Sequence, residues 1–291
     1  MKFGRKDIQL AFKTGTDANK AKFKKECVQG EIYHATDTGF FYVAEVTAGA
    51  NDATLSQFGA SAFTNQYSVS FDGLDDYASV NGDSNIQLHD NFTISAWFRT
   101  GSTVTSNGGI IGWGQSGANG KFRGFGLNSS NQLVFNAYGR FYNPTGATAL
   151  STNTWYHGLL TVTPAAGPNN TATVYINGVQ DSQITSGLAA FTYSSTNVAQ
   201  SYYGGSERFL GHIDELSLFN SVLSATDIAT IYNGGNGPAD ISSLNPVAWW
   251  RMGDGTENAS GTTVYDMSDN SNNLTLYNIE SPNGFVEVVP S

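Results

Sequence analysis

The sequence predicts an all-β protein whose main body is a sandwich of two sheets, preceded by a small module rich in β-hairpins. Charged residues make up only 13% of the 291 residues, whereas glycine alone contributes 33. Such a composition is typical of many short strands joined by turns. Apolar and polar residues also alternate in several segments after residue 66, as expected for strands that bury one face.

Residues 1–60 form the predicted N-terminal module. Residues 8–12 (IQLAF) indicate a strand, and the basic stretch 17–27 indicates a short helix. Residues 31–35 and 40–46 have strand composition and flank a turn at 36–39, where Gly39 can supply the positive φ that a four-residue turn needs. The small, polar residues from 47 to 66 suit a linker.

Charge divides the chain in the same place. Residues 1–60 carry eight basic and seven acidic residues, whereas the remainder carries six basic and 17 acidic residues. The acidic body would repel phosphate backbones, so we expect no nucleic-acid ligand. Cys27 is the one cysteine, which excludes an internal disulfide framework and a multi-cysteine zinc site. No apolar run approaches the about 20 residues that span a bilayer, so we expect no membrane insertion.

The main body, predicted over residues 61–240, opens with residues 67–71, which return through a Gly- and Asp-rich turn to residues 77–80. Residues 92–98 place Phe92, Ile94, Ala96 and Phe98 on one face and Trp97 on the other. Both faces are therefore partly covered, as in a two-sheet sandwich. Further strands are predicted in QLVFNAYG, WYHGLLTVT, ATVYINGVQ and LGHIDELSLFN.

Two local signals mark connections in this body. Asn177 and Gly178 form the favoured two-residue hairpin loop of type I′. SATDIATIYNGG predicts one short helix that Ser224 caps, with Asp227 at the third helical position and Gly234 at its end.

The successive motifs FDGLDDY, ISAWF, NTWYHG, VYINGV and GHIDELSLFNSVLSATDIATIY, over residues 67–235, resemble those of laminin-G-like, concanavalin A-like lectin/glucanase sandwiches. The resemblance implies a jelly roll of two antiparallel sheets. It also implies that the domain binds carbohydrate or protein, often with calcium, and less often hydrolyses glycans.

The N-terminal module resembles the repeat at the start of bacteriophage tail fibres and tropism determinants. The matching positions are Gly15, Thr16, Gly30, Glu31, Tyr33 and the turn at 36–38. The resemblance implies a trimerising or virion-docking module. The alternative is an ordinary hairpin within a single domain.

Catalysis has little support in the sequence, so we expect a protein that is not an enzyme. Glycoside hydrolysis uses two carboxylates about 5 to 9.5 Å apart, and relatives with this chemistry carry a Glu-x-Asp-x-x-Glu strand. The nearest segment here has Asp214 and Glu215 adjacent, so alternation would point them to opposite faces. The chain also lacks the Gly-x-Ser-x-Gly elbow of a serine hydrolase.

A calcium site is the predicted metal centre. Hard cations take several oxygen ligands from carboxylates and turn carbonyls, and Asp72, Asp75 and Asp76 share one turn. By resemblance, Asp214 approaches this turn in the folded sandwich. The alternative is that Asp72 and Asp75 only brace the turn through hydrogen bonds to the backbone.

A ligand surface is expected where aromatic and polar side chains gather in loops, because sugars stack on aromatic faces. The candidates are Tyr138, Arg140, Tyr142, Tyr202 and Tyr203. The alternative is simple loop packing.

Residues 241–291 are predicted to add strands that pack on the sandwich. Segments like 245–278 usually precede the Phe-Asp-Gly strand in the laminin-G-like family, whereas here the segment follows the helix. Its many apolar side chains need burial, either within the same chain or by a swap with a neighbouring subunit. A second, incomplete sandwich is the alternative. We expect Trp250 to be mostly buried.

These patterns predict a phage virion protein, assembled in the host cytoplasm. The N-terminal module would attach a homotrimer to other virion proteins, and the sandwich would bind a host surface glycan or protein. A purely structural capsid- or tail-decorating protein is the first alternative, and a polysaccharide depolymerase is the second.

Overall fold

The protein divides into two units, Met1–Thr64 and Asn65–Ser291. In the first unit, the computed structural model describes the backbone of four strands, together with Phe63 and Thr64. In the second unit it describes residues 65–80, 86, 88, 91–103, 108–114, 122–137, 145–166, 169–187, 196–200, 207–255, 261–279 and 284–290. No described helix is long and apolar enough to cross a membrane.

The first unit contains a four-stranded sheet in the order β1 (Phe12–Gly15), β2 (Ile32–Ala35), β3 (Phe41–Glu45) and β4 (Thr54–Phe58). β1 and β2 are parallel, whereas β2 and β3 pair antiparallel, which confirms the two strands of the predicted hairpin. β4 pairs with β3 inside the stretch predicted as a linker, so that prediction is wrong there. Pairing with a neighbour makes a strand of a segment whose composition is weakly strand-like. The predicted helix at 17–27 lies outside the described residues.

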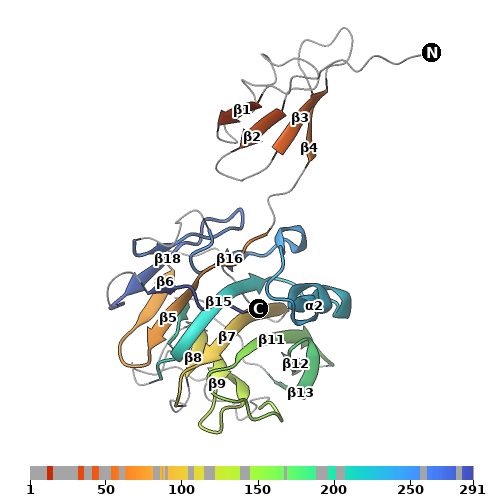
Figure 1. Ribbon diagram of the computed structural model, residues 1–291. Coiled ribbons are helices and arrows are strands. Elements are labelled where there is room, and N and C mark those ends of the chain that lie inside the picture. Colours follow the sequence, from red (N-terminus) through yellow and green to blue (C-terminus); the bar gives the residue numbers. More distant parts are fainter. Residues whose placement is uncertain are drawn as a thin grey trace, which may run out of the picture. The chain divides into compact units, whose positions relative to one another are not determined.

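The second unit is a sandwich of two antiparallel sheets, which confirms the predicted fold class (Figure 1). The strands of its seven-stranded sheet are, in order, β10 (Leu133–Ala137), β9 (Phe122–Leu127), β8 (Gly109–Gly114), β14 (Thr196–Val198), β6 (Tyr77–Val80), β18 (Leu274–Tyr277) and β17 (Thr263–Val264).

The strands of the eight-stranded sheet are β13 (Val179–Gly187), β12 (Asn169–Ile176), β11 (Trp155–Pro164), β7 (Phe92–Thr100), β15 (Leu210–Phe219), β5 (Ser68–Asp72) and β19 (Phe285–Val286), with β16 (Ala248–Trp250) paired to β15. The predicted hairpin joins β12 to β13, and both Asn177 and Gly178 have positive φ, as a type I′ turn requires.

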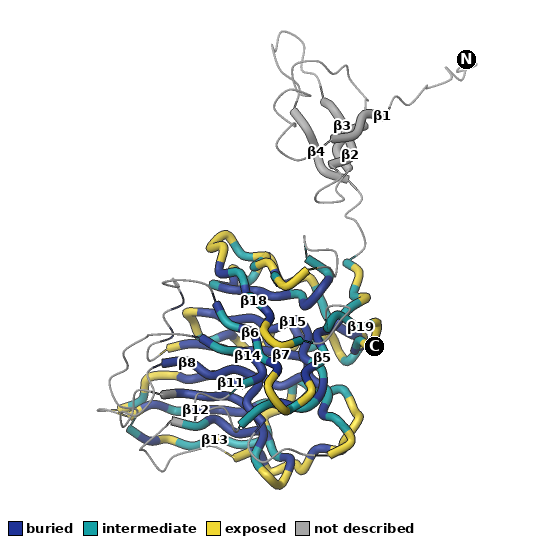
Figure 2. The backbone as a smooth tube through the Cα atoms, turned by 90° about the vertical axis from the view of Figure 1, so that its left-hand side faces the viewer, coloured by how far each residue is buried: buried dark blue, intermediate teal, exposed yellow. Residues whose placement is uncertain are grey.

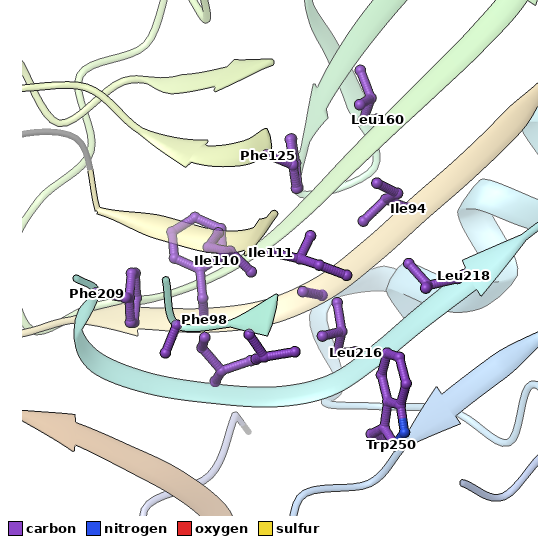
Figure 3. Packing of buried hydrophobic residues seen from close by; sticks show 14 of the residues in the cluster. Ile94, Phe98, Ile110, Ile111, Phe125, Leu160, Phe209, Leu216, Leu218 and Trp250 are labelled. Atoms are coloured by element: carbon purple, nitrogen blue, oxygen red, sulfur yellow. The ribbon is translucent and has the colours of Figure 1, made fainter. Parts of the chain in front are cut away.

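The apolar core lies between the two sheets (Figure 2). β7 supplies Phe92, Ile94, Ala96 and Phe98, all fully buried, as its alternation predicts. Figure 3 shows Ile94 and Phe98 of this strand packed with residues from the facing sheet, among them Phe125 and Ile111.

Helix α2 (Ala225–Tyr232) covers the outer face of β7, where the Tyr232 ring stacks on Trp97 with centroids 6.0 Å apart. Ser224 and Asp227 form the predicted capping box. The helix ends in two left-handed residues, the C-cap Asn233 with a φ of 54° and the predicted Gly234 with a φ of 63°. Two 3-10 turns follow, at Asn233–Gly235 and Ser242–Leu244.

The C-terminal segment contributes strands to both sheets of its own chain. β16 pairs with β15, β18 pairs with β6, and β19 pairs with β5. Trp250 is fully buried, as predicted, and its Nε1 donates to the Asn272 carbonyl at 2.8 Å. The segment therefore completes the sandwich within the chain.

Candidate functional site

The turn between β5 and β6 gathers three carboxylates, those of Asp72, Asp75 and Asp76, which we call the acid turn. One oxygen from each lies within 4.8 Å of the others. Asp72 Oδ1 accepts from the backbone N–H of Leu74 at 2.7 Å, and Asp76 Oδ2 accepts from the Asp72 N–H at 2.9 Å. These bonds brace the turn through Asp72, as the alternative interpretation of the sequence expected, and through Asp76, whereas that interpretation named Asp75. Asp72 and Asp75 are also exposed, and a set of carboxylate oxygens fits the ligand preference of calcium.

Asp214 does not join the acid turn, contrary to the sequence prediction. β15 and β5 pair with Leu210 opposite Asp72, so Asp214 lies four residues further along the strand, a rise of about 13 Å. Its Oδ2 instead accepts from Asn65 Nδ2 at 2.9 Å. The antiparallel register, which the sequence does not reveal, separates the two groups.

Asp214 and Glu215 form a buried acid pair at a β-bulge. The register between β15 and β7 shifts after Asp214, and Glu215 has a φ of 47°, so simple alternation does not describe the strand here. Glu215 Oε1 accepts from Arg251 Nε at 3.0 Å, and Oε2 accepts from Trp249 Nε1 at 2.6 Å. Both carboxylates therefore have partners inside the protein.

Burial sets the proton affinity of this pair. Desolvation raises the pKa of Glu215 to about 7, against the opposing attraction of Arg251. The pKa of Asp214 is raised well above its ordinary value by burial and by the neighbouring Glu215. Asp254 lies close enough to raise both pKa values further, and its own carboxylate accepts from the backbone of Gln66 and Tyr67. These three carboxylates link residues 65–67, at the start of the sandwich, and residues 249–251, around β16, to strand β15.

A second group of side chains gathers on the outer face of the seven-stranded sheet. Tyr77 of β6 and Tyr277 of β18 are directly opposite in register, and their rings stack with centroids 4.7 Å apart and planes 11° apart. The guanidinium carbon of Arg208 lies 4.7 Å from the centroid of Tyr77. We call Arg208, Tyr77 and Tyr277 the aromatic ladder. Tyr277 is 38% exposed, so this aromatic surface is open to solvent.

Hydrogen bonds join the aromatic ladder to the acid turn. Arg208 Nη1 donates to the Asp76 carbonyl at 3.3 Å, and Asn278, next to Tyr277, donates through Nδ2 to the Asp75 carbonyl at 3.1 Å. An exposed aromatic face and a set of carboxylate oxygens therefore share one edge of the sandwich. This arrangement can stack on a ring and hold a hard cation beside it.

The predicted ligand residues Tyr138, Arg140, Tyr142, Tyr202 and Tyr203 lie outside the described residues. The aromatic ladder was missed because its members come from three distant segments that only the sheet brings together. The one local signal was the alternation in LTLYN, which places Tyr277 on the face opposite to the buried Leu274 and Leu276.

The two packed antiparallel sheets define a lectin-like β-sandwich protein. Residues 71–229, more than half of the chain, match the family described as the concanavalin A-like lectin/glucanases superfamily, and the chain belongs to this family.

Several solved structures are similar to this chain at low sequence identity. A Bacteroides ovatus protein, provisionally described as carbohydrate binding, is 17% identical with a TM-score of 0.58, covering 90% of this chain and 70% of that one. The CBM40 of a Ruminococcus gnavus sialidase is 11% identical with a TM-score of 0.43, covering 55% and 94%. Domain 4 of the Geobacillus stearothermophilus arabinanase AbnA is 18% identical with a TM-score of 0.42, covering 55% and 74%. No curated protein sequence matches this chain.

Proposed function

We propose that this protein is a surface component of a bacteriophage virion, such as a tail fibre or spike, whose sandwich binds a glycan or receptor on the host. The aromatic ladder carries the binding part of this proposal. An exposed tyrosine face beside hydrogen-bonding groups is the kind of surface on which sugar rings stack, and the fold family includes lectins. The likeness to a protein with a provisional carbohydrate-binding description supports the same reading.

The proposal is binding without catalysis. The acid pair on β15 supports this, because Asp214 and Glu215 are buried and their oxygens accept hydrogen bonds from Asn65, Trp249 and Arg251. A general acid has to reach the glycosidic oxygen. Carboxylates that are buried and hydrogen-bonded in this way stabilise the fold and do not contact a substrate.

The virion role rests on the N-terminal resemblance and the charge division of the chain. The first unit would dock a homotrimer onto other virion proteins, and the acidic sandwich would face the host. In the decorating alternative the same sandwich binds only virion proteins, and in the depolymerase alternative it cleaves the glycan that it binds.

The test is glycan-array binding by the full chain, followed by two assays on the best ligand. Saturable binding without release of reducing sugar is the expected result. Release of reducing sugar would favour the depolymerase, and absence of any glycan binding would favour decoration. Imaging virions with an antibody to this chain, together with analytical ultracentrifugation, tests the location and the trimer.

A further inference from the structure

We propose that the open ring face of Tyr277, over Gly261, is a stacking subsite for an uncharged sugar. This inference rests on the proposed glycan binding and names the place and the ligand class. Its basis is the order of groups across the sheet edge, which leaves one end of the aromatic ladder closed and the other open.

The closed end is the side of Arg208. The backbone of Arg208 pairs with that of Gln200 in an isolated antiparallel β-bridge, and Gln200 follows β14. β14 lies on the side of β6 away from β18. The guanidinium therefore sits at the β14 side of Tyr77, and Tyr277 occupies the other side. The positive charge of the ladder lies two rings away from the open face.

The open end is the side of β17. Thr263 pairs with Thr275 and Val264 pairs with Leu274, so the antiparallel register places Gly261 opposite Tyr277. The Leu276 N–H donates to the Thr262 carbonyl at 2.7 Å, which continues this register. Gly261 has a φ of +78°, and within the described part of the chain no heavy atom beyond its two sequence neighbours lies within 4 Å of where a Cβ would stand. The register thus places a residue without a side chain across from Tyr277.

The surroundings of this face suit the hydroxyl groups of a sugar. Thr263 and Thr275 are cross-strand partners on the same outer face as Tyr277, since each lies an even number of residues from Tyr277 or Gly261 along its strand. Both are half-buried. A sugar ring that continues the stack beyond Tyr277 would place its hydroxyls toward these side chains.

Charge selects against anionic sugars. The acid turn lies beside the ladder, because Arg208 and Asn278 donate to the backbone carbonyls of Asp76 and Asp75. The chain after residue 60 carries 17 acidic and six basic residues. When no calcium is bound at the acid turn, a sialic or uronic acid at the open face would meet a negative field, whereas an uncharged hexose or N-acetylhexosamine would not.

The test uses the full chain on an array of neutral oligosaccharides and of the same backbones with sialic or uronic acid. The best-binding neutral oligosaccharide is then titrated against Tyr277→Ala, Tyr277→Phe and Gly261→Asn. Asparagine tolerates the positive φ of Gly261 and adds a side chain at the position that the register places opposite Tyr277. Gly234→Asn is the matched control, because Gly234 is also exposed, with a φ of +63° and with Asn236 Nδ2 3.6 Å from where its Cβ would stand.

Tyr277→Ala and Gly261→Asn should each weaken binding about tenfold, the upper range for one aromatic stack. Tyr277→Phe and Gly234→Asn should bind like the wild type. Salt should leave the affinity for the neutral ligand unchanged.

The failures are separable. A wild-type chain that binds no glycan overturns the proposed function, and this inference with it. Wild-type binding that Tyr277→Ala and Gly261→Asn both leave intact overturns only the subsite. A preference for the acidic members of the array overturns the uncharged ligand class.

Discussion

Truncating Trp250 to alanine tests whether the C-terminal segment is an integral part of the sandwich. The indole is fully buried, lies in the main core beside Leu216 (Figure 3), and donates to the Asn272 carbonyl at 2.8 Å. Trp→Ala changes in a core cost about 3–5 kcal/mol. In a domain of this size each kcal/mol shifts the melting temperature by about 2–4 °C, so we expect a drop of about 6–20 °C.

The assay is thermal and urea unfolding of the full chain, with circular dichroism as the signal. Tyr265→Ala is the control, because Tyr265 belongs to the same segment but is 40% exposed, and its loss should shift the melting temperature little. A chain ending at residue 240 should be insoluble or much less stable, since it lacks β16, β17, β18 and β19. If Trp250→Ala melted within about 2 °C of the wild type, the segment would be a dispensable tail.

Three further predictions concern the acid pair, the acid turn and the first unit. Because burial raises the pKa of Glu215 from 4.5 to about 7, the folded state keeps a proton that the unfolded chain has lost. The contribution of this group to the free energy of unfolding should thus fall by about 3 kcal/mol between pH 4 and pH 8; parallel pH profiles for wild type and Glu215→Gln would contradict this. Calcium should raise the melting temperature through the acid turn, and the proposal fails if chelator changes nothing and elemental analysis finds no calcium. Deleting residues 1–60 should leave a folded, soluble sandwich that no longer enters particles, and normal incorporation would refute the docking role.

Local patterns predicted the elements that depend on local physics. The alternation in residues 92–98 predicted β7 and its buried face, the Asn177 and Gly178 pair predicted the β12 to β13 hairpin, and Ser224 with Asp227 predicted the start of α2. Each depends on steric or hydrogen-bonding rules that act within a few residues.

Elements that depend on neighbours escaped the sequence analysis. β8 (GIIGWG) and β9 (FRGFGL) are rich in glycine and lack clean alternation, yet both lie within the seven-stranded sheet. β4 was hidden in a small, polar stretch for the same reason. Such segments become strands because flanking strands satisfy their backbone hydrogen bonds.

The candidate site shows the same division. The carboxylates of the acid turn lie within five consecutive positions, so sequence alone could group them. Placing Asp214 required the register of β15 against β5, and that register moved it away from the turn and into a buried pair with Glu215. The aromatic ladder required the pairing of β6 with β18, which joins nearly opposite ends of the sandwich sequence.

In the proposed binding mode, the position of β18 links folding to binding. The same strand buries Leu274 and Leu276 in the core and presents Tyr277 to solvent, because its side chains alternate between the two faces. Stacking on Tyr77 holds the Tyr277 ring in the orientation proposed for ligand binding. That stack exists only while β18 is paired with β6. A change that weakens the core side of the strand should therefore weaken glycan binding in step with stability, whereas Tyr277→Ala should weaken binding while the melting temperature stays close to that of the wild type. The two effects distinguish a strand that merely closes the sandwich from one that also builds its binding edge.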